Sequence, residues 1–287
     1  MSTTLKKGSE EEFDQNWKNR LETNYNHWVK GTPQNQIQLA FRSHWKYFKE
    51  LMQGCDYKTC LEVGSGRGSI SSYFADNGFD CTLLDTSESI LETARDIFEA
   101  NGHEAEYVHG NALDMPFEDN SFDVVISIGL LEHFEDIETP ILEQYRVLKP
   151  GGLFLGYIVP ERPENVQRHF NWINKMLKSV HSLFSSGKKQ TVEKVDLFRS
   201  DFGSERYLPV INKLKIKDLT VTGLYPLPMI SHSPEFPFSL MPKYMEKGLT
   251  MFYRGVLSFR KMIYGKNPWT CDEEFGQAFL IAFKKDT

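Results

Sequence analysis

The sequence predicts an α/β fold, a mostly parallel sheet with helices on both faces. Short apolar runs that suit buried strands alternate with helical segments from about residue 59 to residue 157. The run Phe122–Ile128 is almost wholly apolar, which is typical of a strand buried on both faces. Such alternation indicates parallel strands joined by crossover helices.

The expected elements follow one another in a regular order. Strands are predicted at 59–63, 81–84, 105–109, 122–128 and 153–158, and again at 216–222 and 278–283. Helices are predicted at 69–77 and 87–100, and from residue 139 to just before Pro150. Ser87 suits a helix N-cap, and so does Thr139, because Pro140 after it loses no hydrogen bond in the first turn.

Composition and charge narrow the range of functions that the chain can have. The chain has 287 residues, 40% of them hydrophobic and 25% charged, which fits one large globular domain or a core with insertions. The net charge of -6 argues against a nucleic-acid partner, since proteins that bind phosphate backbones are usually basic. We find no apolar stretch of membrane-spanning length and no secretory signal.

The four cysteines form neither a CxxC pair nor a zinc spacing. We therefore expect small core residues in a reducing compartment, no metal site, and a cytoplasmic location.

Five segments are expected. Residues 1–55 form an N-terminal helical segment over the site, and 56–160 form the core. Residues 161–204 form a helical insertion, 205–225 and 271–287 complete the core, and 226–270 form an insertion rich in proline and aromatic residues. Two apolar stripes run at helical spacing, Val166, Phe170, Ile173, Leu177, Val180 and Phe184, and then Met245, Leu249, Phe252, Val256, Phe259 and Ile263.

The simplest interpretation packs both stripes on the core, where they can also serve as a lid over a substrate pocket. On this interpretation we expect no stable membrane association. A role for either helix at a membrane surface is the alternative.

A glycine-rich turn follows the first strand. Gly64, Gly66 and Gly68 resemble a dinucleotide-binding turn, but Ser69 stands where the third glycine of that fingerprint would fall. Glu62 precedes the turn and can help to hold an ammonium group. Asp85 ends the second strand, where an acidic residue can accept hydrogen bonds from both hydroxyls of a ribose. A ligand with adenosine and an ammonium group, but no phosphate, suits this set.

Taken in order, these motifs resemble class I S-adenosylmethionine (SAM)-dependent methyltransferases, and most closely the small-molecule branch with the ubiquinone and menaquinone enzymes. The runs that carry the resemblance are 61–68 (LEVGSGRG), Asp85, 110–117 (GNALDMPF), 121–125 (SFDVV), 131–134 (LEHF) and 146–152 (RVLKPGG). The resemblance implies a Rossmann-like sheet of seven strands, the last of them antiparallel. It is silent on the helical insertions.

The resemblance also implies the residues that bind SAM. Position by position they are Glu62, Gly64, Ser65 and Gly66 for the methionine part, Asp85 for the ribose, Thr86 beside the adenosine, Asn111 and Ala112 at the adenine edge, and Ile128 and Gly129 beside the ligand. The family commonly has Asp where Asn111 stands, although an amide oxygen can still accept from the adenine amine.

The candidate catalytic residues are His133, Tyr25 and His27. His133 follows the fourth strand, where it could act as a general base or orient the acceptor. Tyr25 and His27 lie in an aromatic stretch that could fold over SAM, and Tyr157 could line the same site. For all four residues, packing or a structural hydrogen bond is the alternative.

The sequence thus predicts an enzyme that transfers a methyl group from SAM to an N or O atom of a partly apolar small molecule by in-line displacement. One alternative is a lipid or quinone methyltransferase acting at a membrane surface. Another is a catalytically inactive SAM-binding partner subunit. An NAD-dependent oxidoreductase is disfavoured by Ser69 after Gly68.

Overall fold

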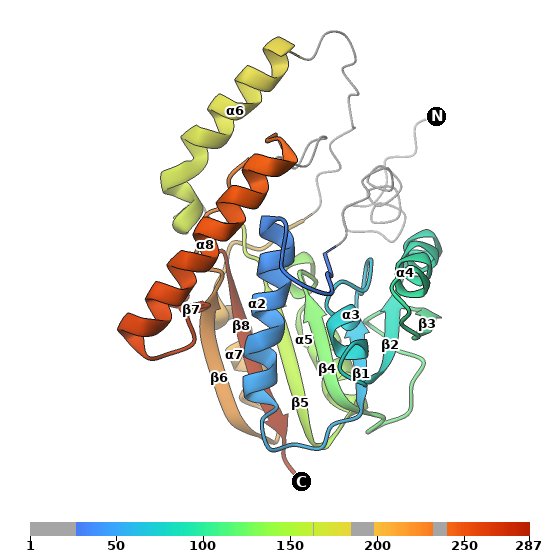
Figure 1. Cartoon of the computed structure of the whole chain (residues 1–287). Helices are drawn as coiled ribbons and strands as arrows, with labels where there is room; N and C mark the ends of the chain where they lie inside the picture. The colour runs from blue at the N-terminus through green and yellow to red at the C-terminus, as the bar shows by residue number, and fades with distance from the viewer. Residues whose placement is uncertain (1–26, 163, 185–197, 232–239) are drawn as a thin grey trace, which may run out of the picture.

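The computed structural model describes residues 27–162, 164–184, 198–231 and 240–287 (Figure 1). Its centre is an eight-stranded sheet with the order β3-β2-β1-β4-β5-β8-β6-β7. The strands are β1 (Thr59–Val63), β2 (Asp80–Asp85), β3 (Glu106–His109), β4 (Phe122–Ile128), β5 (Leu148–Ile158), β6 (Ile216–Leu224), β7 (Thr270–Cys271) and β8 (Ala278–Lys285). All seven predicted strands are present.

The sheet is mostly parallel, as predicted. β3, β2, β1, β4 and β5 pair in parallel, and β8 runs antiparallel between β5 and β6. The prediction of seven strands is wrong by one, because β7 adds an eighth strand at the edge of the sheet. Thr270 and Cys271 pair there with Leu224 and Gly223. Two residues are too few for a hydrophobic pattern to reveal a strand.

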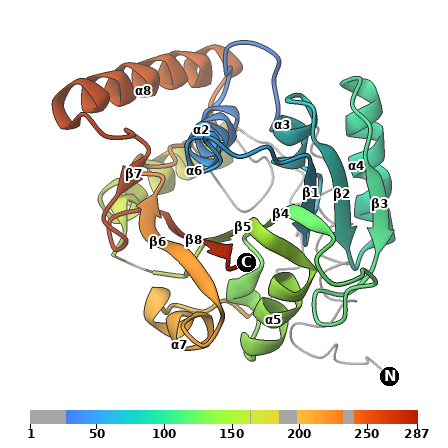
Figure 2. The same cartoon turned by 90° about the horizontal axis from the view of Figure 1, so that it is seen from below.

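Helices cover both faces of the sheet, as expected. They are α2 (Gln36–Leu51), α3 (Ser71–Ala75), α4 (Glu88–Ala100), α5 (Glu138–Val147), α6 (Asn171–Phe184), α7 (Leu208–Ile211) and α8 (Lys243–Tyr264). Figure 2 shows α5 and α7 on one side of the sheet and α2 and α3 on the other. Each layer has its own core, because alternate strand residues face opposite ways. Cys60 belongs to the same core cluster as Phe48 and Phe98, whereas Leu61 belongs to the cluster of Ile141 and Ile211.

Side-chain caps begin several of these helices. Ser87 caps α4, since its hydroxyl accepts a hydrogen bond from Ile90 N at 3.4 Å. Thr139 does not cap α5, contrary to our prediction. The N-cap position is held by Ile137, which has no capping side chain, and the Asp136 carboxylate just before it accepts from Glu138 N at 2.9 Å and from the Thr139 hydroxyl at 2.8 Å. The helix starts at Glu138, two residues before the Pro140 that the Thr139–Pro140 pair indicated.

The two apolar stripes differ in how far they are buried. On the segment that contains α6, Val166 is buried and Ile173 and Leu177 pack against the core, while Val180 is 45% exposed. The second stripe was predicted to pack on the core, and for most of its residues that prediction is wrong. Phe252 and Phe259 are 64% and 57% exposed.

The buried side of α8 carries other residues. It consists of Glu246, Thr250, Tyr253 and Leu257, and α8 packs along α2. No helix in the described ranges has both the length and the hydropathy to cross a bilayer.

Candidate active site

The loops after β1 and β2 are joined at the carboxyl edge of the sheet. Gly64 N and Ser65 N both donate hydrogen bonds to the Leu84 carbonyl, at 2.9 and 3.0 Å. Farther along the same turn, Gly66 N donates to the Asp85 carboxylate at 2.8 Å. The predicted methionine-binding and ribose-binding residues are thus brought together where open α/β sheets bind their ligands.

The glycine turn depends on glycine at three positions. Gly64, Gly66 and Gly68 have φ of +65°, +51° and +64°, a region that side chains disfavour. A Cβ atom at Gly64 would lie 2.7 Å from Leu130 Cδ1, and one at Gly68 would lie 2.5 Å from Leu83 Cδ2. The glycine positions of the turn therefore offer bare backbone, and there is no room for a side chain at Gly64 or Gly68.

Glu62 lies beneath this turn and is only 3% exposed. Its carboxylate accepts hydrogen bonds from Ser71 N at 3.1 Å and from the Ser71 hydroxyl at 2.5 Å. Burial raises the pKa of Glu62 to about 8, against the opposing effect of the Ser71 bonds and with a smaller contribution from nearby Asp85. Among the described residues, no lysine or arginine forms an ion pair with Glu62. A ligand ammonium group would therefore find a matching partner here.

Asp85 is held by the backbone on both carboxylate oxygens. Besides the Gly66 bond, its second oxygen accepts from Ser87 N at 3.1 Å. Burial raises the pKa of Asp85, and these backbone donors act in the opposite direction. Because each carboxylate oxygen can accept more than one hydrogen bond, ribose binding remains possible. The adjacent Thr86 carbonyl accepts from His109 Nε2 at 2.9 Å.

Asn111 uses its side chain within its own turn. Its amide oxygen accepts from Leu113 N at 2.9 Å, which is an Asx turn. Ala112 is buried beside it, at 6% exposure. An adenine amine would have to share this oxygen, so the role predicted for Asn111 stays a prediction.

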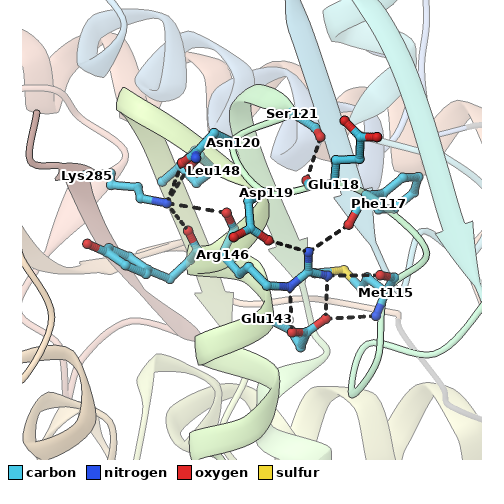
Figure 3. A network of polar contacts seen from close by, with 11 residues as sticks. Met115, Phe117, Glu118, Asp119, Asn120, Ser121, Glu143, Arg146, Leu148 and Lys285 are labelled. Atoms are coloured by element: carbon cyan, nitrogen blue, oxygen red, sulfur yellow. Dashed lines mark hydrogen bonds and ion pairs between the residues drawn. The ribbon is translucent and has the colours of Figure 1, made fainter.

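Arg146 fixes the segment that follows Asn111–Ala112 (Figure 3). It donates to the carbonyls of Met115 and Phe117 at 2.9 and 2.7 Å and makes two 2.8 Å bonds to Glu143. Met115 N in turn donates to Glu143 at 2.9 Å. The arginine of the 146–152 motif therefore positions the predicted adenine loop from the side of α5.

The residues after β4 form the other wall of this edge. Ile128 pairs with Tyr157 in the sheet, and Gly129, at φ +67°, donates its N–H to the Tyr157 carbonyl at 2.9 Å. His133 ends a short 3₁₀ helix, Leu131–His133, and its Nδ1 lies 2.7 Å from the Phe198 carbonyl. A carbonyl only accepts, so Nδ1 carries the proton, and in the neutral ring Nε2 is the basic nitrogen.

Glu132 is a site residue that our sequence reasoning missed. It is fully buried, and its carboxylate accepts from Val159 N at 3.2 Å. Burial raises the pKa of Glu132 to about 7. A Cβ atom at Gly129 would lie 3.6 Å from this carboxylate, so the acid packs under the Gly129 turn. Its position directly before the candidate base His133 in the sequence could have indicated Glu132 as a site residue.

The N-terminal segment reaches the glycine turn through His27. Its Nδ1 forms a hydrogen bond with the hydroxyl of Ser69, and its ring stacks on Phe41 at 4.9 Å between centroids. This contact agrees with a segment that folds over the site, but the catalytic role predicted for His27 stays a prediction. Tyr25 lies outside the described residues.

A second missed residue is His44 on α2. The Trp269 indole N–H donates to His44 Nδ1 at 2.9 Å, and the His44 ring lies 4.5 Å from that of Tyr157. Burial lowers the pKa of His44 to about 3, so the ring is neutral. Tyr157 is therefore part of a buried aromatic cluster at the end of β5. In the described ranges, no group of three or more His, Cys, Asp or Glu residues could hold a metal ion.

Comparison with known proteins finds relatives of the part of the chain that holds β1 to β5. Residues 61–156 match the family model described as a methyltransferase domain. The chain is 39% identical over 122 residues to a demethylmenaquinone methyltransferase of Listeria monocytogenes serotype 4a, covering 40% of this chain and 51% of the relative. It is 36% identical over 123 residues to the Geobacillus stearothermophilus protein of the same name, covering 40% and 52%. The chain thus spans about half the length of the curated relatives it matches.

The fold has solved counterparts. A SAM-dependent methyltransferase from Thermotoga maritima superposes with a TM-score of 0.50 at 18% identity, covering 87% of this chain and 91% of that one. At this identity the similarity establishes the fold alone. The predicted Rossmann-like fold and the resemblance to SAM-dependent methyltransferases are both confirmed. Residues 61–156 are therefore similar to a methyltransferase domain.

Proposed function

We propose that this chain is a SAM-dependent methyltransferase that acts on a partly apolar small molecule. The observation that carries the proposal is the position of Glu62, a buried acid beneath three glycines of positive φ. Bare backbone allows a ligand to approach closely, and the acid suits an ammonium group. Asp85 and the loop at Asn111 lie at the same edge, where they suit an adenosine.

SAM would supply an electrophilic methyl group on a sulfonium centre, so the protein needs no nucleophile of its own. Its tasks are to position the acceptor in line with the methyl group, to exclude water and to remove one proton. We assign the last task to His133 Nε2. The Phe198 carbonyl holds the ring through Nδ1 at 2.7 Å, which leaves Nε2 as the basic nitrogen of the neutral ring.

The acceptor is proposed as a small molecule methylated on N or O. The region that matches the family model runs from residue 61 to residue 156, so it does not include α2, α6 or α8. These outer helices and the segments beside them are where an acceptor pocket would differ from that of the relatives. A quinone is one acceptor class to test, since the relatives are named for demethylmenaquinone.

Ligand binding tests the cofactor. Calorimetry should detect SAM and S-adenosylhomocysteine and no NAD. Asp85→Ala should weaken SAM by tenfold or more, since hydrogen bonds to a charged acceptor are worth about 1.5–3 kcal/mol each. Asp80→Ala is the matched control, because Asp80 lies exposed at the opposite end of β2. Tight NAD binding without SAM binding would overturn the proposal.

A transfer screen tests the acceptor. Labelled SAM should be offered with amine, phenol, carboxylate and quinone acceptors, and the product identified. SAM binding with no transfer to any acceptor would instead fit a non-catalytic subunit.

A nucleic-acid acceptor makes a different prediction. It requires affinity for RNA or DNA that falls steeply with salt, and we expect none from a chain of net charge -6.

A further inference from the structure

The side of α8 that faces away from the core is apolar along its whole length. We define the outer face of α8 by residues at helical steps of three, four and seven. They are Tyr244, Met245, Met251, Phe252, Phe259, Met262 and Ile263, exposed by 75%, 48%, 58%, 64%, 57%, 73% and 55%, with Gly248 and Gly255 between them. None of these residues is charged. Figure 2 shows α8 along an outer edge of the molecule, on the far side of α2 from the sheet.

Such a face is costly for a helix that only packs on a core. Soluble proteins expose single apolar side chains freely, but a contiguous apolar patch usually marks a binding surface. The opposite side of α8 already packs on the protein, since Tyr253 is only 6% exposed and Leu257 only 8%. The outer face therefore needs a partner from outside the described part of the chain.

The charge on α8 indicates which partner. The helix has five basic residues and one acid, Glu246, which is buried at 5% exposure. Lys243, Lys247, Arg254 and Lys261 are spaced by four and seven residues, so they form one flank beside the outer face. The chain as a whole is acidic, at -6. A local basic flank on an acidic protein points to an anionic partner.

This flank continues into a cleft of about 280 Å³ between α2 and α8. Arg42 and Lys46 of α2 face Arg254 and Lys261 of α8 across it, with Glu50 as the acid in its lining. The pKa of Lys46 is lowered, first by burial and then by the positive charges of Arg42, Arg254 and Lys261. These cations repel one another, and an anion in the cleft would relieve the repulsion.

We propose that α8 binds the surface of an anionic phospholipid membrane, with its outer face among the upper acyl chains and the α2–α8 cleft on lipid phosphates. An apolar face flanked by lysine and arginine is what an interfacial helix needs. A second copy of the chain fits less well, because an antiparallel twofold contact of two α8 helices would bring the two basic flanks together. The proposal reverses our expectation of no stable membrane association, and it is independent of the proposed function.

Vesicle flotation tests the proposal without SAM or an acceptor. The full chain should float with phosphatidylcholine–phosphatidylglycerol vesicles, float much less with phosphatidylcholine alone, and detach as salt increases. Arg254→Gln with Lys261→Gln should weaken binding to the anionic vesicles about 30-fold, since each basic residue near such a surface is worth about 1 kcal/mol. Lys213→Gln with Lys217→Gln is the control, because both lysines are exposed and lie outside α2 and α8.

A second pair of variants tests the contribution of the apolar side chains to vesicle binding. Phe252→Ser with Phe259→Ser should weaken binding at least tenfold, whereas Phe202→Ser, at a phenylalanine 57% exposed elsewhere, should not. Circular dichroism should show that all variants fold. The proposal fails if the chain floats with neither vesicle, or if the α8 variants bind as well as their controls. A dimer that the Phe252 and Phe259 changes dissociate would assign the outer face to a second copy.

Discussion

The carboxyl edge of the sheet and the outer face of α8 differ in how completely the protein partners its own groups. At the edge, Asp85 has a backbone donor on each carboxylate oxygen, and Gly64 and Gly68 have no space behind them. On α8, large side chains such as Phe252 and Met262 are mostly exposed. The edge is therefore fixed in one geometry by its own contacts, whereas the described part of the chain leaves the outer face of α8 largely uncovered.

The difference has a consequence for substitutions. A change at the edge disturbs several neighbours at once, so its effects should be large and should reach SAM binding or turnover. A change on the outer face of α8 should leave the fold and the chemistry intact. Substitutions at the edge test the first half of this comparison, and the vesicle experiment tests the second.

The largest effect is expected at His133. If Nε2 removes the proton, His133→Ala should lower turnover by about 10²–10⁴-fold while SAM affinity stays nearly unchanged. Turnover should be measured over a range of pH with the acceptor found in the screen. His169→Ala is the control, since His169 is exposed. Full turnover of His133→Ala at every pH would make His133 structural, and loss of SAM binding would place it in the cofactor site.

The next effect is on stability, at Gly68. Gly68→Ala forces a side chain into a position 2.5 Å from Leu83 and 2.8 Å from Phe98, at φ +64°. We expect a loss of about 2–4 kcal/mol in the free energy of unfolding, from overpacking and backbone strain together. Gly78→Ala shares a positive φ of +83° but has nothing within 4 Å. Denaturant unfolding should therefore show a clearly smaller loss for Gly78→Ala, and equal losses would contradict the packing argument.

The sequence predicted the core of the fold because local signals there agree with one another. The alternation of strands and helices, the cap at Ser87 and the glycine turn all indicate the same order of elements. Predictions failed where the sequence signal covers very few residues or allows more than one interpretation. β7 has only two residues, and α5 begins at Glu138 after Ile137, a residue with no capping side chain that gives no signal in the sequence.

The α8 stripe failed for a different reason. Periodicity identifies an apolar stripe but not whether that stripe faces the core. On α8 the core side includes Glu246 and Thr250, whereas Phe252 and Phe259 face outward. In the site, Glu132 and His44 were missed because their burial depends on segments far away in the sequence. Glu132 packs under strand-end residues of β5, and His44 meets Trp269.

The third prediction concerns Arg146. Arg146→Met removes the bonds to the Met115 and Phe117 carbonyls and to Glu143, so we expect a loss of about 1–3 kcal/mol in stability. SAM affinity should fall as well if the adenine loop is where we predict. Arg168→Met is the control, since its ion pair with Glu164 is exposed and worth only about 0.3–0.5 kcal/mol. Thermal unfolding and calorimetry measure both effects, and equal results for the two variants would remove Arg146 from the positioning role.

The fourth prediction is the dependence of stability on pH at Glu62. Burial raises its pKa to about 8, above the value of about 4.3 expected in the unfolded chain. The folded state therefore favours the neutral acid, and the stability that this group contributes is fully present below pH 4.3. It is lost as the pH rises toward 8. Glu62→Gln should flatten this part of the stability curve, as measured by unfolding at a series of pH values.

The protonation state of Glu62 should also change when the ammonium group of SAM binds. A cation placed beside Glu62 favours the carboxylate, so SAM binding near pH 7 should lower its pKa and release up to about one proton. Calorimetry in buffers with different ionisation enthalpies measures this release directly. Glu62→Gln should release no proton from this site. Glu132→Gln should still release it, because the carboxylate of Glu132 faces Val159 N and not the glycine turn. If the unaltered protein binds SAM without releasing a proton, the ammonium group lies away from Glu62.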